Sequence, residues 1–316
     1  MNAKSLPRNP DFDDDRVIWN DEYSGIYQPV SYSDQFDEQW RLYLERKIGF
    51  CDHTGAETSY EYIDDRIFEI TGIKNYLLSQ KWGALTPLVS ILSGREKRRE
   101  RRKVGGVDHF DLRFSIDFFR GKKCLDIACG AGRWTKTLTS LGANVFSIDA
   151  SGHALKSTMR FTPTIEKLDL FEIPERSDLC GVFDFVLAWG VLMHTHDPKK
   201  AFESAAKAVK PGGAFYFCVY APHYHASDFV RSSRRKYHKE LLLPAERLAY
   251  AYELTDGKPE MAISYLDMLN TFYNWTIPEE IIFKWCADNG FSEPIIINRS
   301  DAGRCHHHTL TWRKAL

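Results

Sequence analysis

Short apolar segments alternate with helical segments from residue 121 onward, and this alternation constrains the fold more than any other feature of the chain. The apolar segments have the length of strands and lie at residues 123–128, 144–149, 165–168, 183–188 and 214–220. Sequence with helical spacing lies between them, as at residues 199–209, which precede the helix-stopping sequence Lys210-Pro211-Gly212-Gly213. Strands that alternate with helices over such a length predict an α/β fold built on a parallel, doubly wound sheet.

Largely helical sequence interrupts this alternation at residues 221–277. The pattern then resumes with a helix at 278–289 and with strands at 294–297 and near 307–312. We therefore expect one α/β domain, residues 120–316, that carries a helical insertion at 221–277.

Two further regions precede this domain. Residues 1–40 contain nine acidic and three basic residues, and the first thirty lack a sustained apolar period, which predicts a mobile acidic arm at residues 1–33. From residue 34 the apolar spacing becomes helical, and Gly105-Gly106 breaks the chain after the last of these helices. We expect residues 34–119 to form a helical cap region.

A glycine-rich turn follows the first strand, in the segment Leu125-Asp126-Ile127-Ala128-Cys129-Gly130-Ala131-Gly132-Arg133. The small residues Ala128, Gly130 and Gly132 allow the backbone to turn sharply and to approach a ligand closely. A dinucleotide fingerprint fits poorly, because alanine takes its first glycine position and Arg133 its last. Asp126 would also repel a pyrophosphate. S-adenosylmethionine carries an ammonium and a sulfonium but no phosphate, so the charge favours it over NAD.

This segment resembles motif I of the class I S-adenosylmethionine-dependent methyltransferases, which is written acid-x-G-x-G-x-G. Asp149 ends the second strand 23 residues after Asp126, and Asp169-Leu170 closes the third strand region. Residues 183–195 are similar to the family's fourth strand and its following loop, and Lys210 to Gly213 resembles the turn before the fifth strand. The resemblance covers about 120–220 and 278–316. It is nearest to the group that includes quinone-biosynthesis and small-molecule methyltransferases, and it implies a Rossmann-like, seven-stranded sheet with helices on both faces.

The resemblance also implies which residues bind the cofactor. They are Asp126, Ala128, Gly130, Gly132, Asp149, Asp169, Leu170 and Trp189. Asp149 would bind both ribose hydroxyls, and Asp169 with the backbone of Leu170 would bind the adenine. Simpler alternatives remain open: the glycines could form an ordinary turn, the two acids could be helix N-caps, and Trp189 could be a packed aromatic residue.

Methyl transfer from a sulfonium mainly requires that the two reactants are aligned, and a base is needed only where the acceptor is a hydroxyl or an ammonium. His194 follows the fourth strand at the edge where open α/β sheets bind ligands, so we expect it to be that base. His223 and His225 follow the fifth strand and are alternatives; with Tyr220 they are our candidates for substrate binding. A capping or supporting histidine is the simpler interpretation of His194, and Met193 replaces a histidine that is frequent in the family.

The acceptor is narrowed by motifs that the chain lacks. The fourth strand ends in Ala188-Trp189-Gly190, without the Asn-Pro-Pro-Tyr box with which amino-methylating nucleic-acid enzymes hold a flipped base. The paired glutamates of protein arginine methyltransferases are also missing. Small-molecule O-, N- or C-methylation remains, with O-methylation favoured. Cys305-His306-His307-His308 predicts no metal site, because side chains alternate between the two faces of a strand.

Two basic clusters leave the acceptor's charge open. The first spans Arg95 to Lys103, and the second comprises Arg231, Arg234, Arg235, Lys236 and Lys239. A solvated helix face explains each of them, and an anionic acceptor or RNA are the alternatives. An RNA (tRNA) methyltransferase and a non-catalytic S-adenosylmethionine-binding regulatory protein therefore remain competing functions.

Composition indicates in which cellular compartment this chemistry takes place and on which class of substrate. The net charge is −1, from 42 basic and 43 acidic residues, which argues against a dedicated nucleic-acid binder. The longest apolar run, residues 214–221, is far shorter than the ~20 residues of a membrane span, and the first residues lack the apolar core of a secretory signal. Seven scattered cysteines without a C-x-x-C pair suit reduced thiols. We expect a cytoplasmic enzyme that converts S-adenosylmethionine to S-adenosylhomocysteine and acts on a small molecule.

Overall fold

The computed structural model describes residues 33–49, 60–92, 114–241, 243–298 and 305–315. Its centre is a seven-stranded sheet in the order β3-β2-β1-β4-β5-β7-β6. The strands are β1 (Lys123–Ile127), β2 (Asn144–Asp149), β3 (Ile165–Lys167), β4 (Phe183–Trp189), β5 (Val209–Tyr220), β6 (Ile295–Ile296) and β7 (His306–Trp312). The Rossmann-like α/β fold expected from the sequence is thus confirmed.

Strands β1 to β5 are parallel, whereas β7 is antiparallel to both of its neighbours, β5 and β6. We refer to the edge where β1 to β5 end as the carboxyl edge. Because β7 runs in the opposite direction, its first residue, His306, pairs with Tyr220 at the end of β5. The start of β7 therefore belongs to the carboxyl edge.

The start of β5 differs from the prediction. The sequence predicted a turn at Lys210 to Gly213, but these residues are part of β5, which begins directly after α8 (Pro198–Ala208). The pairing with β4 is irregular there, since Phe183 pairs with Val209 and Phe185 pairs with Ala214. The extra residues in β5 absorb the turn, as a β-bulge does.

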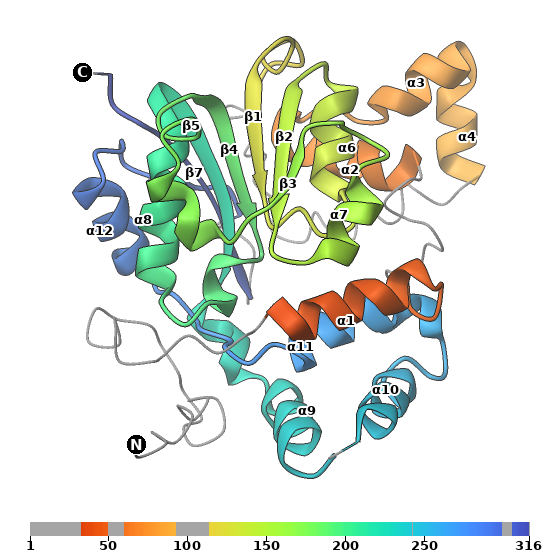
Figure 1. Cartoon of the computed structure of the whole chain (residues 1–316). Coiled ribbons are helices and arrows are strands. Elements are labelled where there is room, and N and C mark those ends of the chain that lie inside the picture. Colours follow the sequence, from red (N-terminus) through yellow and green to blue (C-terminus); the bar gives the residue numbers. More distant parts are fainter. Residues whose placement is uncertain (1–32, 50–59, 93–113, 242, 299–304, 316) are drawn as a thin grey trace.

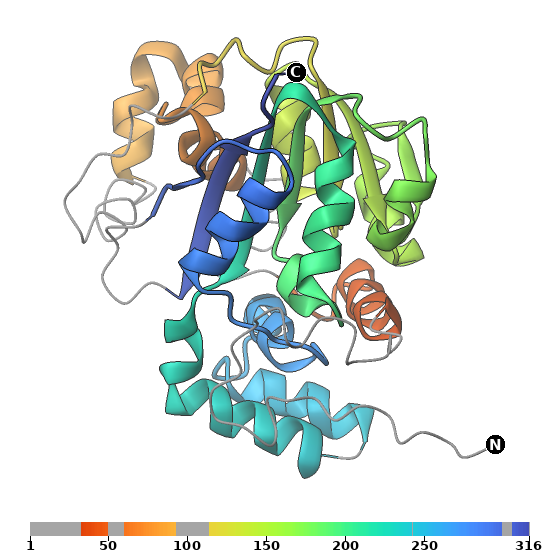
Figure 2. The same cartoon turned by 90° about the vertical axis from the view of Figure 1, so that its left-hand side faces the viewer.

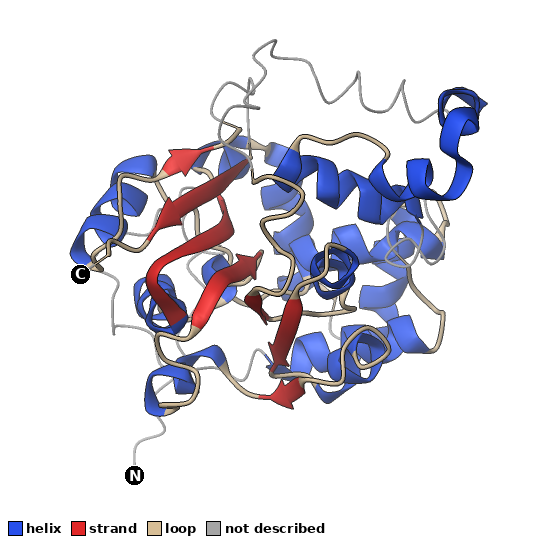
Figure 3. Ribbon diagram, turned by 90° about the horizontal axis from the view of Figure 1, so that it is seen from above, coloured by secondary structure: helices blue, strands red, loops and turns tan. Residues whose placement is uncertain are grey.

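Helices cover both faces of the sheet, as Figures 1 and 3 show. On one face lie α2 (Tyr60–Thr71) and α6 (Arg133–Ser140), whose Ile67 and Leu138 are buried against the sheet. On the other face lie α8 and α12 (Glu279–Asp288), whose Phe202 and Trp285 are buried against Phe215 and Phe217 of β5. Both faces of the central strands are therefore buried, which explains their continuous apolar sequence.

The remaining helices have three locations. Helix α7 (Gly152–Thr158) follows β2, η6 (Leu170–Glu175) follows β3, and η7 (Leu192–His194) follows β4. Helices α3 (Tyr76–Trp82), η4 (Gly83–Leu85) and α4 (Thr86–Leu92) continue from α2 at the side of the sheet. The insertion comprises η8 (Pro222–Ala226), α9 (Asp228–Lys239), α10 (Pro244–Glu253), η9 (Pro259–Met261) and α11 (Ala262–Leu269).

Helix α1 (Ser33–Leu44) lies beside α11 across the carboxyl edge, which Figures 1 and 2 show from two directions. An N-terminal helix and the insertion thus meet over the ends of the strands. Apart from Ser33, the predicted acidic arm lies outside the described residues. Within the described ranges, no helix has both the length and the apolar character that crossing a membrane requires.

Candidate functional site

The turn after β1 holds three small residues in the left-handed region of backbone conformation. Ala128 has a φ of 56°, Gly130 of 54° and Gly132 of 84°. A Cβ atom at Gly130 would lie 2.7 Å from Cζ2 of Trp40, and one at Gly132 would lie 2.7 Å from Cδ2 of Phe161. Both glycines are therefore required by conformation and by space. At Ala128 the same conformation costs roughly 1–2 kcal/mol, a strain of the kind that gathers at functional sites.

Asp149 lies against this turn from the end of β2. Its carboxylate is buried and accepts two backbone hydrogen bonds, from the N–H of Gly130 at 2.9 Å and from the N–H of Ser151 at 2.8 Å. Burial raises the pKa of Asp149 to about 6, against the effect of these two hydrogen bonds. The carboxylate thus has a fixed orientation beside the turn, and each oxygen keeps further capacity to accept a hydrogen bond.

Asp126 lies beneath the turn. It is buried and accepts a hydrogen bond of 2.6 Å from the hydroxyl of Thr135 in α6. Burial raises the pKa of Asp126 to about 7, and the charge of Asp149 adds to this effect. Asp126 therefore links β1 to α6 through this hydrogen bond. Protein groups stabilise the negative charge of its carboxylate less than burial destabilises it.

The other predicted cofactor residues have structural contacts of their own. Asp169 is the N-cap of η6, where it accepts from the N–H of Phe171 at 3.0 Å and forms a capping box with Glu172. Leu170 is buried in the first turn of η6. The ring of Trp189 packs 5.1 Å from that of Trp134 on the face covered by α2 and α6. The N-cap role of Asp169 and the packed position of Trp189 match the simpler alternatives that the sequence left open. Binding of the cofactor by Asp169, Leu170 and Trp189 stays a prediction.

His194 lies in η7 at the carboxyl edge and is buried. Its Nδ1 is 3.0 Å from the carbonyl oxygen of Tyr273, a carbonyl that can only accept, so Nδ1 carries the proton and Nε2 the lone pair. Burial lowers the pKa of His194 to about 4. The imidazole is therefore neutral near pH 7, which is the form that a base requires.

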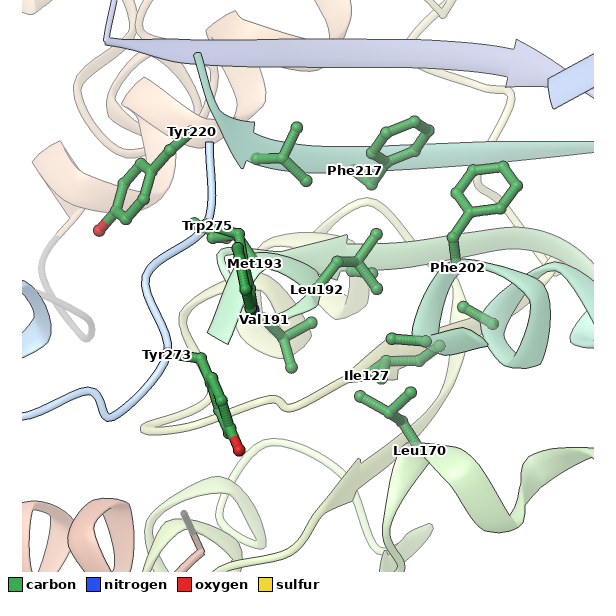
Figure 4. Packing of buried hydrophobic residues seen from close by; sticks show 14 of the residues in the cluster. Ile127, Leu170, Val191, Leu192, Met193, Phe202, Phe217, Tyr220, Tyr273 and Trp275 are labelled. Carbon is green, nitrogen blue, oxygen red and sulfur yellow. The ribbon is translucent and has the colours of Figure 1, made fainter. Parts of the chain in front are cut away.

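A loop before α12 fixes the position of His194. The backbone N–H of Trp275 donates to the carbonyl of Met193 at 3.0 Å, and its indole N–H donates to the carbonyl of Thr195 at 3.0 Å. Figure 4 shows Met193 and Trp275 packed together, with Tyr273 beyond them and Tyr220 at the end of β5. Residues at the end of the insertion thus brace the loop after β4.

Tyr220 belongs to a buried aromatic group at the same edge. Its ring stacks on that of Tyr224, with centroids 3.9 Å apart and planes 4° apart, and lies edge-on to His194 at 5.4 Å. His306 lies 5.0 Å from Tyr220. Sequence reasoning missed the place of His306 in this group, because the antiparallel direction of β7, which brings His306 to this edge, has no signal in a single sequence.

The two histidines of η8 are not placed in this group. His223 is exposed, and the side chain of His225 lies outside the described part of the structure. Their binding of substrate stays a prediction, whereas Tyr220 and His194 are brought together.

Helix α1 forms a roof over the turn. Trp40 packs on Gly130, and Phe36 lies 6.2 Å from His194. Asp37 accepts hydrogen bonds from the hydroxyl of Ser151 at 2.6 Å and from the N–H of His153 at 3.2 Å, at the start of α7. Although burial alone would raise the pKa of Asp37, these bonds and His153 lower it to about 2.

The basic cluster of α9 does not present all its charges to solvent or to an anion. Arg234 is 1% exposed and donates to the carbonyl of Met268, to the hydroxyl of Thr271 at 3.0 Å and to the carbonyl of Thr271 at 3.0 Å. For Arg234 both interpretations of the cluster, a solvated face and an anion site, are therefore wrong: it binds the end of α11. The cluster from Arg95 to Lys103 lies outside the described residues, so its role stays a prediction.

Side chains at the start of β7 alternate between the two faces of the sheet, as they do in any strand. His306 and His308 lie on one face of the sheet, 6.3 Å apart between ring centroids, and His307 is buried on the other. Among the residues that the structure describes, no group of three or more histidine, cysteine, aspartate or glutamate side chains could hold a metal ion.

Comparison with known proteins bears on this arrangement. A family model described as a methyltransferase domain matches residues 97–291, well over half of the chain. The ubiquinone biosynthesis O-methyltransferase of Thiobacillus denitrificans is 35% identical over 101 residues, which are 31% of this chain and 44% of that protein. The mitochondrial ubiquinone biosynthesis O-methyltransferase of Schizosaccharomyces pombe is 34% identical over 100 residues, 30% of this chain and 36% of that protein.

The chain thus spans less than half of the length of these curated relatives. Among solved structures, PKMT2 from Rickettsia typhi in complex with AdoHcy is 14% identical, covers 63% of this chain and 50% of its own, and has a TM-score of 0.45.

Proposed function

Because the chain belongs to the methyltransferase-domain family, the class I S-adenosylmethionine-dependent methyltransferases, we propose that it transfers a methyl group to an oxygen atom of a small-molecule acceptor. The observation that carries this proposal is the buried carboxylate of Asp149, held by the N–H groups of Gly130 and Ser151 beside a left-handed glycine turn. The names of the curated relatives, ubiquinone biosynthesis O-methyltransferases, support oxygen as the methylated atom.

The donor set fits S-adenosylmethionine. Each oxygen of Asp149 uses one lone pair on a backbone N–H, so the carboxylate can accept two further hydrogen bonds from the ribose hydroxyls. When bound, the cofactor supplies a methyl group that its sulfonium has already activated. We assign its methionine end to Asp126, Ala128, Gly130 and Gly132, and its adenine to Asp169, Leu170 and Trp189.

On the acceptor side, we assign the role of base to His194. Its Nδ1 is occupied by the carbonyl of Tyr273, which directs the lone pair of Nε2 away from the backbone that braces the ring. An acceptor hydroxyl that donates to Nε2 would pass its proton to this nitrogen as the oxygen–methyl bond forms, since an imidazole with a pKa of about 4 does not deprotonate a free hydroxyl beforehand. The stacked rings of Tyr220 and Tyr224 support a planar, aromatic acceptor.

We further propose that the regions 34–119 and 221–277 select the acceptor, since α1 and α11 lie across the carboxyl edge. Arg234 donates to oxygens of Met268 and Thr271, so we do not assign it to an anionic group of the acceptor. A cytoplasmic setting is part of the proposal, supported by the thiol form of Cys124, Cys129, Cys180, Cys218, Cys286 and Cys305.

A transfer assay with isotope-labelled donor and a panel of phenols and catechols tests this function, with aliphatic amines as the nitrogen arm. We expect labelled methyl ethers, and His194→Gln should lower kcat by ~10²–10⁴-fold while donor affinity stays the same. His238→Gln is a matched control, because His238 is a partly buried histidine that is likewise bonded to a carbonyl, that of Leu269, and its pKa is likewise lowered by burial. Transfer to amines alone would contradict O-methylation, and equal loss in both variants would contradict the role of His194.

A further inference from the structure

Gln39 of α1 and Asp267 of α11 form a polar pair that joins the two helices lying across the carboxyl edge. The pair uses only part of its hydrogen-bonding capacity. The side-chain amide of Gln39 in α1 donates to the carboxylate of Asp267 in α11 at 2.6 Å, across 228 positions of sequence. Gln39 is 1% exposed, and its Oε1 has no hydrogen-bond partner among the described residues. A buried acceptor left without a partner loses its hydrogen bonds to water and destabilises the fold. The pair therefore carries an acceptor atom that folding alone does not explain.

Asp267 is half-buried and also has acceptor capacity to spare. Its carboxylate accepts the hydrogen bond from Gln39, whereas an ionised carboxylate can accept about four. Burial raises the pKa of Asp267, while Arg133 and the Gln39 bond oppose this effect. Both members of the pair thus offer acceptor oxygens, and one of them can carry a negative charge.

The location of the pair connects it with the proposed site. Gln39 directly precedes Trp40, which packs on Gly130. Asp267 interacts electrostatically with Arg133, the residue after the glycine turn, and with Tyr220 at the end of β5. The pair therefore lies over the carboxyl edge, between the turn assigned to the cofactor and the tyrosine assigned to the acceptor.

We propose that Gln39 and Asp267 form a binding site for a protonated amine that belongs to one of the two reactants. The free Oε1 of Gln39 and the carboxylate of Asp267 match the N–H donors and the positive charge of an alkylammonium group. The amine can come from the methionine end of the methyl donor or from the acceptor. This inference rests on the proposed function, because it concerns ligands of that site.

Calorimetric titration of the full chain distinguishes the two sources. S-adenosylhomocysteine and its deaminated analogue are titrated first; phenethylamine and 2-phenylethanol are then titrated into protein saturated with S-adenosylhomocysteine. The variant is Asp267→Asn, which keeps the shape and removes the charge. Asp288→Asn is the control, since Asp288 forms an exposed ion pair with Lys284 on α12, away from the roof.

If the donor supplies the amine, Asp267→Asn weakens S-adenosylhomocysteine by about tenfold to hundredfold and leaves the deaminated analogue unchanged. If the acceptor supplies it, S-adenosylhomocysteine binds the variant normally, and the preference of the wild type for phenethylamine over 2-phenylethanol is lost. Gln39→Met should cause a smaller loss of affinity for whichever amine-bearing ligand Asp267→Asn weakens.

Unchanged preferences in Asp267→Asn would overturn the inference, whatever the melting temperature of the variant. Failure of the proposed function looks different: the wild type would then bind neither S-adenosylhomocysteine nor its deaminated analogue.

Discussion

Replacing Gly130 by alanine tests whether α1 is seated on the glycine turn. Gly130 has a φ of 54°, and an added Cβ would lie 2.7 Å from the indole of Trp40. The left-handed conformation costs alanine roughly 1–2 kcal/mol, and overpacking costs typically ~1–3 kcal/mol. The free energy of unfolding should therefore fall by about 2–5 kcal/mol, the sum of these two costs.

Two further variants separate the two costs. Gly212 also has a positive φ, 73°, but a Cβ there would meet nothing within 4 Å, so Gly212→Ala should show the conformational cost alone. Trp40→Ala should cost about 3–5 kcal/mol by itself. In the double variant the overpacking disappears because the indole is gone, so the two losses should fall short of additivity by about 1–3 kcal/mol.

The assay is urea unfolding followed by far-ultraviolet circular dichroism, because removal of Trp40 changes the fluorescence. Additive losses in the double variant, or equal losses in the Gly130 and Gly212 variants, would refute the contact between α1 and the turn.

Substitutions at three other residues probe the site's surroundings. Burial raises the pKa of Asp126 from 3.8 to about 7 in the folded protein, so the free energy of unfolding should fall as pH rises from about 4 to 7. Asp126→Asn should flatten this pH profile of urea unfolding by roughly 4 kcal/mol. Arg234→Met should lower the free energy of unfolding by more than ~3 kcal/mol, because it leaves buried carbonyls unpaired, and Arg234→Lys should recover part of this loss; unchanged urea midpoints would contradict it. Asp37→Asn should speed hydrogen exchange in α1 while β1 and β4 stay protected, and equal protection of α1 would show that its bonds to Ser151 and His153 do not hold the roof.

The sheet was predictable because both its pattern and its turn chemistry are local. Parallel strands buried on two faces need continuous apolar runs, and the left-handed positions at Gly130 and Gly132 need small residues in a fixed order. The family resemblance then supplied Asp149, and the structure shows this carboxylate bonded to the turn.

The roof was not predictable, because its contacts join distant segments without a pattern. Gln39 and Asp267 are ordinary polar residues of amphipathic helices, and only the tertiary fold brings them together. Arg234 shows a different limit. In sequence it is one of five bases in α9, yet it is buried and donates to the carbonyl groups of Met268 and Thr271. Burial of a charge depends on the partner helix, which a single helix's sequence does not specify.

Calorimetric titration with S-adenosylhomocysteine, for the wild type and for Asp149→Ala, tests the central claim most directly. We predict that the wild type binds and that Asp149→Ala loses about tenfold to hundredfold in affinity, as expected for hydrogen bonds to a charged group. Asp184→Ala is the control, since Asp184 also accepts a backbone N–H, that of Lys123, but lies at the opposite end of β4. Absence of binding by the wild type, or equal affinity of Asp149→Ala, would contradict the assignment of this site to S-adenosylmethionine.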